Sequence, residues 1–348
     1  MRTVRKNVLS LIKLRSTATV LITLLLYTAV ARLLFAAQVV EISENNSCVF
    51  LSTDTQDPVR QSLEKAILNA KKSVCLIIYS LSDGRIVRAL RTAAAHGVEV
   101  SVIHDPVWTP DGAFLLGEKI KSYPRRSKGL MHNKLLSIDH HDAWIGSANM
   151  TSGSLLEQGN LVVAIRSEAI ASAIERLAQT MIERTDYTEG PLHVNNGEET
   201  FTFFFHPFHG EAALQALKER IDKASQRIFV AMFTFTHPDL AEALALAKKR
   251  GVDVRVIMDQ ESSKQASHQI FVRLQREGVP CGYRTKQGLL HSKVALIDTT
   301  LVAGSCNWTK AGFASNHEAM LFIEPLTNSQ QQWLDVWWKS VEHNSSLQ

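Results

Sequence analysis

The sequence predicts an α/β fold made of two similar halves, and three observations support this prediction. Of the 348 residues, 45% are hydrophobic and 21% are charged, as is usual for a chain that folds around a core. The chain also repeats itself, and each copy alternates apolar strand-like runs with helical patterns. This composition excludes a disordered or collagen-like protein, and four cysteines are too few for a disulfide-stapled scaffold.

The first predicted element, residues 1–40, is a targeting segment. Residues 1–37 carry six basic and no acidic side chains around a long apolar run. The Ala-Val-Ala triplet at 29–31 resembles the cleavage site of a secretory signal peptide. Alternatively, the run continues through Val40 and spans the membrane, with Arg32 near the interface. A mitochondrial presequence is disfavoured by the leucine-rich core, so we expect an exported protein that is either secreted after cleavage or membrane-anchored.

The remainder of the chain has a different charge balance from its N-terminal segment. Beyond residue 37 it holds 32 basic and 34 acidic side chains, a net charge of −2. A strongly basic body that binds nucleic acid is therefore excluded. The cysteines lack the C-x-x-C spacing of a zinc site. Cys75 lies in an apolar run and is expected in the core, while Cys48 and Cys281 could pair in an oxidising compartment.

The two halves are recognised by a repeat with an offset of 154 residues. Strand-like runs at 73–81 and 97–105 alternate with helical patterns in the first copy, and the second copy repeats this order from residue 217. Buried sheets in an α/β architecture are therefore expected, with the halves packed about a pseudo-two-fold axis. A polar stretch rich in turn formers separates the copies. We place the halves at 41–190 and 201–348, with a linker at 191–200.

Each half carries the same set of polar residues, which is the most specific feature of the chain. Both copies read H-x-K-x-x-x-x-D followed by G-S-x-N. The members of the first copy are His132, Lys134, Asp139, Ser147 and Asn149, and those of the second are His291, Lys293, Asp298, Ser305 and Asn307. Because the two copies occupy equivalent places in a repeat, we expect them to form one site between the halves.

Strand geometry indicates a role for each member of this set. Histidine and lysine two residues apart project from the same face of a strand. Asp139 and Asp298 lie seven residues beyond their histidines and point to the other face, so we expect them to support neighbouring backbone. In each G-S-x-N segment, a glycine-permitted turn could direct the hydroxyl and the amide at an anion. Ser147 and Ser305 are therefore predicted to bind phosphate together with the two asparagines.

Two histidines, two lysines and two asparagines make a site suited to a phosphate diester. One neutral imidazole can attack phosphorus and form a phosphohistidine. The other, when protonated, can give its proton to the leaving oxygen and later activate water. The lysines and asparagines would stabilise charge on the non-bridging oxygens. No cofactor is expected, and no carboxylate cluster suited to a metal ion is seen in the sequence.

These motifs resemble those of the phospholipase D superfamily, and the resemblance covers about residues 48–345. It implies a duplicated fold of two α/β/α halves with mixed sheets, and a phosphodiesterase activity. The catalytic pair it implies is His132 and His291, with His132 as the nucleophile. The phosphate-binding residues it implies are Lys134, Lys293, Asn149 and Asn307.

One departure from the family pattern concerns an acidic residue downstream of G-S-x-N that orients a catalytic histidine. The second copy supplies Glu318. The equivalent position in the first copy is Asn160, which is not acidic, although Glu157 lies nearby. We therefore expect the two histidines to be polarised differently and to have unlike roles.

The leading substrate hypothesis is a phospholipid, cleaved to phosphatidic acid and the head-group alcohol. The apolar N-terminal segment, the non-basic body and a tryptophan-rich C-terminal helix favour lipid and a membrane surface as partners. Core packing is nevertheless the favoured interpretation of the stripe that contains Trp333 and Trp337. Alternatives are a nuclease of the same superfamily, supported by basic residues around Arg125, a cardiolipin synthase-like phosphatidyltransferase and a non-enzymatic phosphate-binding protein. No obligate protein partner is expected.

Overall fold

The computed structural model describes residues 39, 42 and 47–347. One compact unit extends from residue 40 to the C-terminus and contains both predicted halves. Apart from Val39, the predicted targeting segment at 1–40 lies outside the described residues. Among the residues that are described, no helix combines the length and the hydropathy that crossing a membrane requires.

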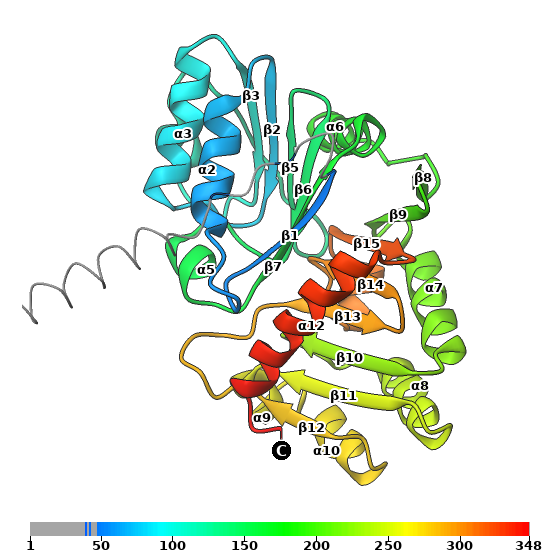
Figure 1. The fold of residues 1–348 in the computed structure, drawn as a ribbon. Helices are drawn as coiled ribbons and strands as arrows, with labels where there is room; N and C mark the ends of the chain where they lie inside the picture. Colours follow the sequence, from blue (N-terminus) through cyan, green and yellow to red (C-terminus); the bar gives the residue numbers. More distant parts are fainter. Residues whose placement is uncertain (1–38, 40–41, 43–46, 348) are drawn as a thin grey trace, which may run out of the picture. The chain divides into compact units, whose positions relative to one another are not determined.

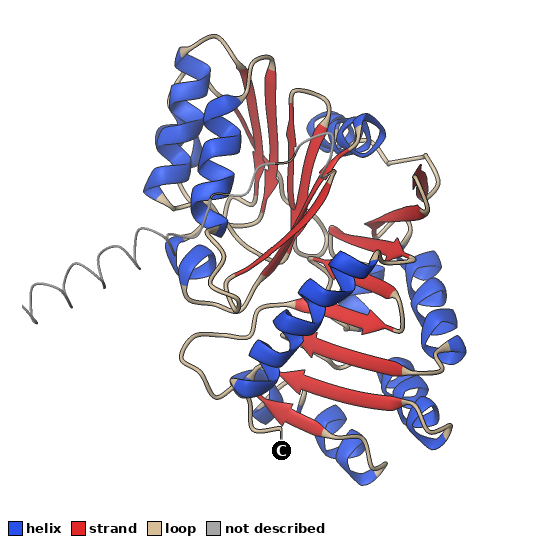
Figure 2. Cartoon of the chain, in the orientation of Figure 1, coloured by secondary structure: helices blue, strands red, loops and turns tan. Residues whose placement is uncertain are grey.

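Within the described residues, the first half contains a seven-stranded mixed sheet (Figures 1 and 2). In order across the sheet, the strands are β1 (Cys48–Ser52), β7 (Leu161–Arg166), β6 (Asp142–Gly146), β5 (Lys134–Ile138), β2 (Ser73–Ile78), β3 (Glu99–His104) and β4 (Lys121–Pro124). β3 pairs in parallel with β2 and β4, and the other pairs are antiparallel. The strands form because apolar residues alternate between two cores, with Leu76 on one side of β2 and Ile77 on the other.

The second half repeats this order in an eight-stranded sheet, again counted over the described residues. Across the sheet lie β12 (Cys281–Tyr283), β11 (Asp253–Met258), β10 (Arg227–Met232), β13 (Lys293–Ile297), β14 (Thr300–Gly304), β15 (Glu318–Glu324), β9 (Glu199–His206) and β8 (Leu192–Asn196). β10, β11 and β12 pair in parallel, as β2, β3 and β4 do. The chain is therefore an α/β fold with two mixed sheets, as the sequence predicts.

Helices cover both faces of each sheet. The helices of the first half are α2 (Val59–Asn69), α3 (Gly84–Ala95), α4 (Gly112–Leu116), α5 (Ser152–Leu156) and α6 (Glu168–Glu183). Those of the second are α7 (Gly210–Lys223), α8 (Pro238–Lys249), α9 (Gln260–Lys264), α10 (His268–Arg276), α11 (Lys310–Ala314) and α12 (Asn328–His343). α2 and α3 pack on one face of the first sheet, and α7 and α8 on one face of the second (Figure 1). α6 and α12 contribute to a third core that both sheets share.

The shared core contains the tryptophans of α12. Trp337 and Trp338 are buried, and the Trp338 ring stacks on Phe229 with ring centroids 4.8 Å apart. The core-packing interpretation of this helix is confirmed. The tryptophan-rich C-terminal helix therefore no longer favours a lipid substrate.

Two further features differ from the simplest interpretation of the sequence. Residues 191–200, taken as a linker, contain β8 and the start of β9, because alternating side chains let this stretch pair with β9 around a turn at Gly197. The four cysteines are free, so Cys48 and Cys281 do not pair. Burial raises the pKa of the Cys75 thiol to about 12 and keeps it unreactive in the core. The predicted boundaries of the halves stay predictions.

Candidate active site

The two predicted motifs lie at the starts of equivalent strands and meet across the two halves. His132 precedes β5, whose first residue is Lys134, and His291 precedes β13, whose first residue is Lys293. The His132 amide donates to the carbonyl of His317 in the second half at 2.9 Å. The His291 amide donates to the carbonyl of Gly159 in the first half at 2.8 Å. Backbone bonds between the halves thus fix both motifs.

The imidazole rings of His132 and His291 lie close together and are shielded from solvent. Their centroids are 6.5 Å apart with an interplanar angle of 66°, and the residues are 6% and 7% exposed. This separation leaves room for a phosphoryl group between the rings. In-line displacement at phosphorus needs a nucleophile on one side and a proton donor on the other, and two facing imidazoles can fill these two roles.

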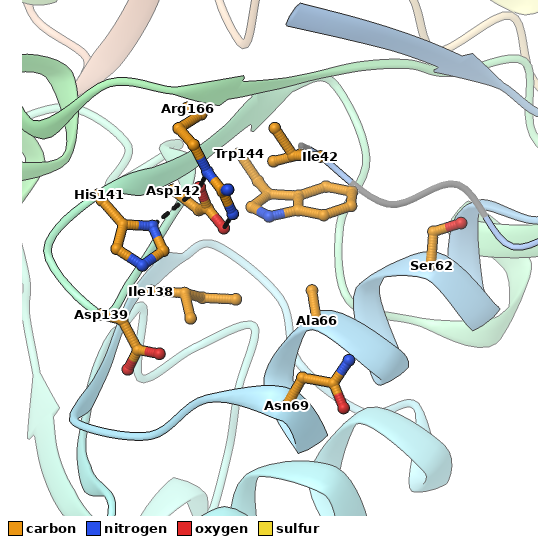
Figure 3. Close-up of a pocket in the computed structure, with 10 residues that line it drawn as sticks. All are labelled: Ile42, Ser62, Ala66, Asn69, Ile138, Asp139, His141, Asp142, Trp144 and Arg166. Carbon is orange, nitrogen blue, oxygen red and sulfur yellow. Dashed lines mark hydrogen bonds and ion pairs between the residues drawn. The ribbon is translucent and has the colours of Figure 1, made fainter. Parts of the chain in front are cut away.

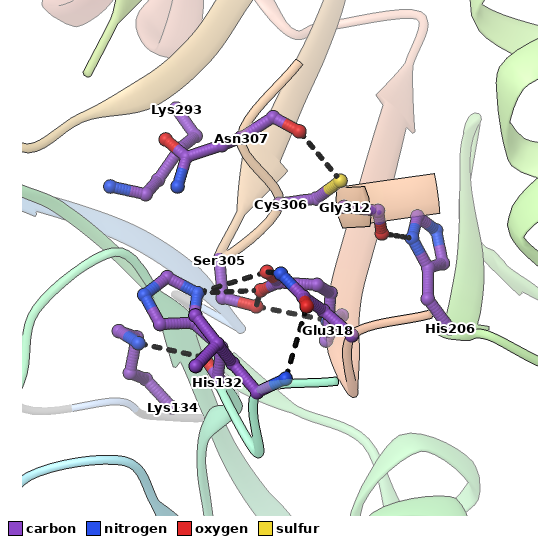
Figure 4. A network of polar contacts seen from close by, with 12 residues as sticks. His132, Lys134, His206, Lys293, Ser305, Cys306, Asn307, Gly312 and Glu318 are labelled. Atoms are coloured by element: carbon purple, nitrogen blue, oxygen red, sulfur yellow. Dashed lines mark hydrogen bonds and ion pairs between the residues drawn. The ribbon is translucent and has the colours of Figure 1, made fainter. Parts of the chain in front are cut away.

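Glu318, at the start of β15, supports His132 (Figure 4). Its carboxylate oxygens lie 2.8 and 3.0 Å from His132 Nδ1. The Ser305 hydroxyl and the Asn316 amide also donate to this carboxylate, at 2.6 and 3.2 Å. These three donors oppose the effect of burial on the Glu318 carboxylate. With Nδ1 donating to Glu318, the imidazole proton resides on Nδ1 and the Nε2 lone pair is free.

Asn160 supports His291 in the equivalent way but without a charge. Its Oδ1 and the Ser147 carbonyl oxygen each lie 3.1 Å from His291 Nδ1. The Asn160 Nδ2 donates to the Ser154 carbonyl at 2.8 Å, which fixes the orientation of the amide. Each histidine is therefore supported from the opposite half, one by a carboxylate and the other by neutral oxygens.

The two G-S-x-N serines do not have the arrangement that the sequence analysis expects. The Ser305 hydroxyl donates to Glu318, and the Ser147 hydroxyl donates to Asn160 Oδ1 at 2.8 Å. Both serines are 1% exposed. Because each hydroxyl hydrogen already has an acceptor, these serines hold the residues behind the histidines, and their role as phosphate ligands stays a prediction.

The two asparagines of these segments differ from each other. Asn307 Oδ1 accepts from the Thr234 amide at 3.2 Å. Asn149 Oδ1 is buried and has no hydrogen-bond partner among the described residues. A buried polar atom without a partner is costly, so the Asn149 side chain is available to a ligand, to whose oxygens its Nδ2 group can donate.

Lys134 and Lys293 are buried beside the histidines in the same geometry. Each ammonium group donates to the carbonyl of the histidine two residues earlier, at 2.7 and 2.6 Å. Each also lies over an aromatic ring: Lys134 is 4.9 Å from the ring centre of Tyr79, and Lys293 is 4.8 Å from that of Phe233. The lysines are therefore held in place by a carbonyl and a ring.

Asp139 and Asp298 lie behind the strands, away from the histidines. Asp139 accepts hydrogen bonds from the amides of residues 71–73, at 2.6 to 3.0 Å. Asp298 accepts from the amides of residues 225–227, at 2.9 Å each. These bonds lower the pKa of both carboxyl groups against the opposing effect of burial. Asp139 thus links the turn after β5 to the start of β2, and Asp298 links the turn after β13 to the start of β10.

The site is electrostatically poised for an anion. Burial, followed by the charges of the two lysines, lowers the pKa of both histidines well below the usual value. Burial lowers the pKa of Lys134 to about 7 and that of Lys293 well below its usual range. Burial raises the pKa of Glu318 to about 7. The negative charge of a bound phosphodiester would favour the ammonium forms of both lysines.

Comparison with known proteins assigns the chain to a family. The family described as "Cardiolipin synthase, PLD-like domain" matches residues 63–182 and 217–338. The chain belongs to this phospholipase D family. Each matched stretch contains one of the two H-K-D motifs.

The sequence relatives of this phospholipase D family member match only part of its length, at low identity. Human mitochondrial cardiolipin hydrolase is 33% identical over 117 residues, which cover 33% of this chain and 46% of that protein. A phospholipase D of Rickettsia typhi is 28% identical over 128 residues, 36% of this chain and 61% of that protein. The chain thus spans about half the length of the curated relatives it matches. The phosphatidylserine synthase structure of Haemophilus influenzae has the same fold, with a TM-score of 0.66, 11% identity and coverage of 88% and 89%.

Two aromatic residues of this site, Tyr79 and Phe233, are not among the site residues predicted from the sequence. Tyr79 and Phe233 lie 4.9 and 5.0 Å from the rings of His132 and His291. Their signal is visible in the repeat, since both are aromatic residues that follow equivalent strands 154 residues apart. The sequence identifies Asn160 as the equivalent of Glu318, but the repeat does not show which histidine it contacts, because the contact joins the two halves.

A separate hollow in the first half is lined by neither His132 nor His291 (Figure 3). Of the predicted site residues, only Asp139 lines it. Asp142 in this hollow pairs with His141 and Arg166, at 2.9 and 2.8 Å. Its charged groups therefore largely compensate one another.

Proposed function

We propose that this protein is a metal-independent phosphodiesterase that hydrolyses phospholipids to phosphatidic acid and the head-group alcohol. The reaction proceeds through a phosphohistidine on His132. The observation that carries this proposal is the unequal support of the two histidines. Glu318 stabilises positive charge on His132, and Asn160 does not do so for His291.

In the first step, His132 attacks the phosphorus of the bound diester. The Nε2 lone pair forms the N–P bond as the P–O bond to the head-group alcohol breaks. The imidazole becomes cationic with its proton on Nδ1, and the Glu318 carboxylate 2.8 Å away offsets that charge. A histidine held by neutral oxygens would lack this stabilisation, which is why we assign the nucleophile to His132.

His291 acts as the acid in this step and as the base in the next. Its Nδ1 faces the neutral oxygens of Ser147 and Asn160, so its imidazolium is the more acidic of the two and transfers its proton to the leaving alkoxide. Neutral His291 then takes a proton from water as the water oxygen attacks phosphorus. The N–P bond breaks, and phosphatidic acid and free His132 are formed.

Lys134, Lys293 and the Asn149 amide bind the non-bridging oxygens. The ammonium groups stabilise the charge that accumulates on phosphorus-bound oxygen, and their fixed positions avoid reorganisation during the reaction. Binding of the diester raises the pKa of both lysines and of His291, which favours the acid form of His291 in the complex. These groups supply acid, base and charge stabilisation together.

Several observations support lipid as the substrate class. Relatives named cardiolipin hydrolase and phospholipase D act on phospholipids by name. The body beyond residue 37 is not basic, and the N-terminal segment is apolar. We propose that this segment exports the protein and either anchors it at a membrane or is cleaved. Cardiolipin and phosphatidylcholine both contain the required diester.

A phosphatidyltransferase reaction is the second candidate, favoured by the family description that names cardiolipin synthase. In it, the hydroxyl of a second lipid replaces water in the attack on the phosphohistidine. A nuclease is a third candidate, favoured by the arginines that line a hollow near β4.

The test uses the full chain in detergent with vesicles of phosphatidylcholine or cardiolipin, a chelator and ethanol. We expect phosphatidic acid and phosphatidylethanol, the latter from ethanol attack on the phosphohistidine. His132→Ala and His291→Ala are expected to abolish both products. Inhibition by the chelator would refute metal independence. A folded parent that cleaves only oligonucleotides would refute the lipid substrate, and one that binds head groups without turnover would indicate a binding protein.

A further inference from the structure

The segment between β3 and β4 exposes large apolar side chains. Val107 is 64% exposed, Trp108 is 54% exposed, and Phe114 on α4 is 86% exposed. Transfer of side chains of this size out of water is favourable and lowers the free energy. Three of them within eight residues of one segment are more than the isolated apolar residues that soluble surfaces ordinarily carry.

This segment contacts the catalytic residues through one ring. The Trp108 and Tyr79 ring centroids are 5.4 Å apart, and the Tyr79 ring in turn contacts His132. The Ser80 hydroxyl donates to the Trp108 carbonyl at 3.0 Å. The exposed segment therefore lies beside the site of chemistry, separated from it by Tyr79.

The duplicated half shows that the fold does not require apolar residues here. Asp105 accepts from the amides of Val107 and Trp108, and Asp259 accepts in the same way from those of Glu261 and Ser262. The local backbone is thus alike, yet the residues 154 positions later are polar. Val107, Trp108 and Phe114 correspond to Glu261, Ser262 and His268. The apolar character belongs to the first half alone.

Arginines lie next to the apolar segment. Pro106, at its start, lines a hollow together with Arg125, Arg126 and Arg184. Arg125 also lowers the pKa of His317, the neighbour of Glu318, to about 4, although burial is the larger cause. Positive charge beside exposed apolar side chains is typical of surfaces that insert into the interface of an anionic membrane.

We propose that residues 106–114, with Arg125, Arg126 and Arg184, form a surface that docks on an anionic phospholipid membrane. The apolar side chains enter the interface and the arginines bind lipid phosphates. The substrate head group is thereby brought next to Tyr79 and His132. This inference rests on the proposed lipid activity, whose substrate class it specifies as anionic phospholipid in a membrane.

The kinetic test replaces two exposed apolar residues of the first half by the residues at the equivalent positions of the second half. The double variant Val107→Glu/Phe114→His in the full chain is expected to lose about tenfold in turnover of lipid in phosphatidylcholine–phosphatidylglycerol vesicles. Its turnover of the soluble diester bis(p-nitrophenyl) phosphate is expected to stay unchanged, because neither side chain contacts the site. Val336→Glu is the matched control, since Val336 on α12 is 61% exposed and outside the surface.

A fluorescence test reads membrane contact without turnover. All six tryptophans lie within the described residues, and among them only Trp108 is exposed. In the full chain on vesicles, brominated anionic lipids are expected to quench tryptophan emission, and Trp108→Phe is expected to abolish that quenching. Trp333→Phe, in a partly buried position, is the control and should leave it intact.

The outcomes separate this inference from the proposed activity. A parent without lipid turnover but with quenching at Trp108 would refute the activity and support the surface. A parent with lipid turnover, no quenching and a fully active double variant would overturn the surface. Quenching by single-stranded DNA and not by brominated lipid would assign the surface to nucleic acid.

Discussion

Replacing Glu318 by glutamine tests the assignment of the nucleophile. Glu318→Gln keeps the size of the side chain and removes its charge beside His132. Glutamine can still accept a neutral hydrogen bond from Nδ1, but it cannot offset the cation that forms when Nε2 bonds to phosphorus. The variant is therefore expected to fold and to bind substrate, and to lose turnover.

The magnitude follows from the contact distance. With Nδ1 and the carboxylate oxygen 2.8 Å apart, the two charge centres are about 4 Å apart, which is worth about 4 kcal/mol at an effective dielectric constant of about 20. A remaining neutral hydrogen bond returns about 1 kcal/mol. The barrier should rise by about 3 kcal/mol, which lowers kcat about 100-fold.

The assay compares kcat for lipid vesicles and for bis(p-nitrophenyl) phosphate. The matched control is Glu175→Gln, because Glu175 also pairs with a histidine and a serine, His140 at 2.9 Å and Ser137 at 2.7 Å, outside the site. The control should retain parental kcat. If Glu318→Gln also stays within about threefold of the parent, our account of the first step is wrong.

Two further predictions concern stability and anion binding. Gly159→Ala should lower the free energy of unfolding by about 3 kcal/mol in urea titrations, because the new Cβ would lie 2.6 Å from Asp54 and 2.7 Å from Arg284, a fully buried ion pair. Gly153→Ala, which meets nothing within 4 Å, should not lower it, and equal stability of both variants would contradict the argument. Dimethyl phosphate should bind with proton uptake near neutral pH, since the anion raises the pKa of Lys134 from about 7. Calorimetric binding heats that are independent of the buffer would contradict this.

Much of the fold and the site can be predicted from the sequence, because the two copies of the repeat can be aligned residue by residue. The run at 97–105 and its copy at 251–259 predict β3 and β11, and the spacing of His132 from Lys134 predicts one face of a strand, which in the structure begins at Lys134. The pairing of Glu318 with His132 does not follow, because the repeat relates residues within each half and contains no signal for contacts between halves. The serine hydroxyls find their acceptors within the same half, Glu318 for Ser305 and Asn160 for Ser147, and the G-S-x-N pattern alone does not show which acceptor each hydroxyl reaches.

The crossed support of the histidines has a consequence for how such a protein can diversify. If two identical chains formed this site, both histidines would face the same supporting side chain, and neither could be committed to one role. Joining the copies in one polypeptide removes that symmetry, so Asn160 and Glu318 can differ. The same freedom applies to the segment after β3, which is apolar in one copy and polar in the other. In the mechanism and docking surface that we propose, a single gene thus specifies a directional site, with one side for attack and docking and the other for proton transfer.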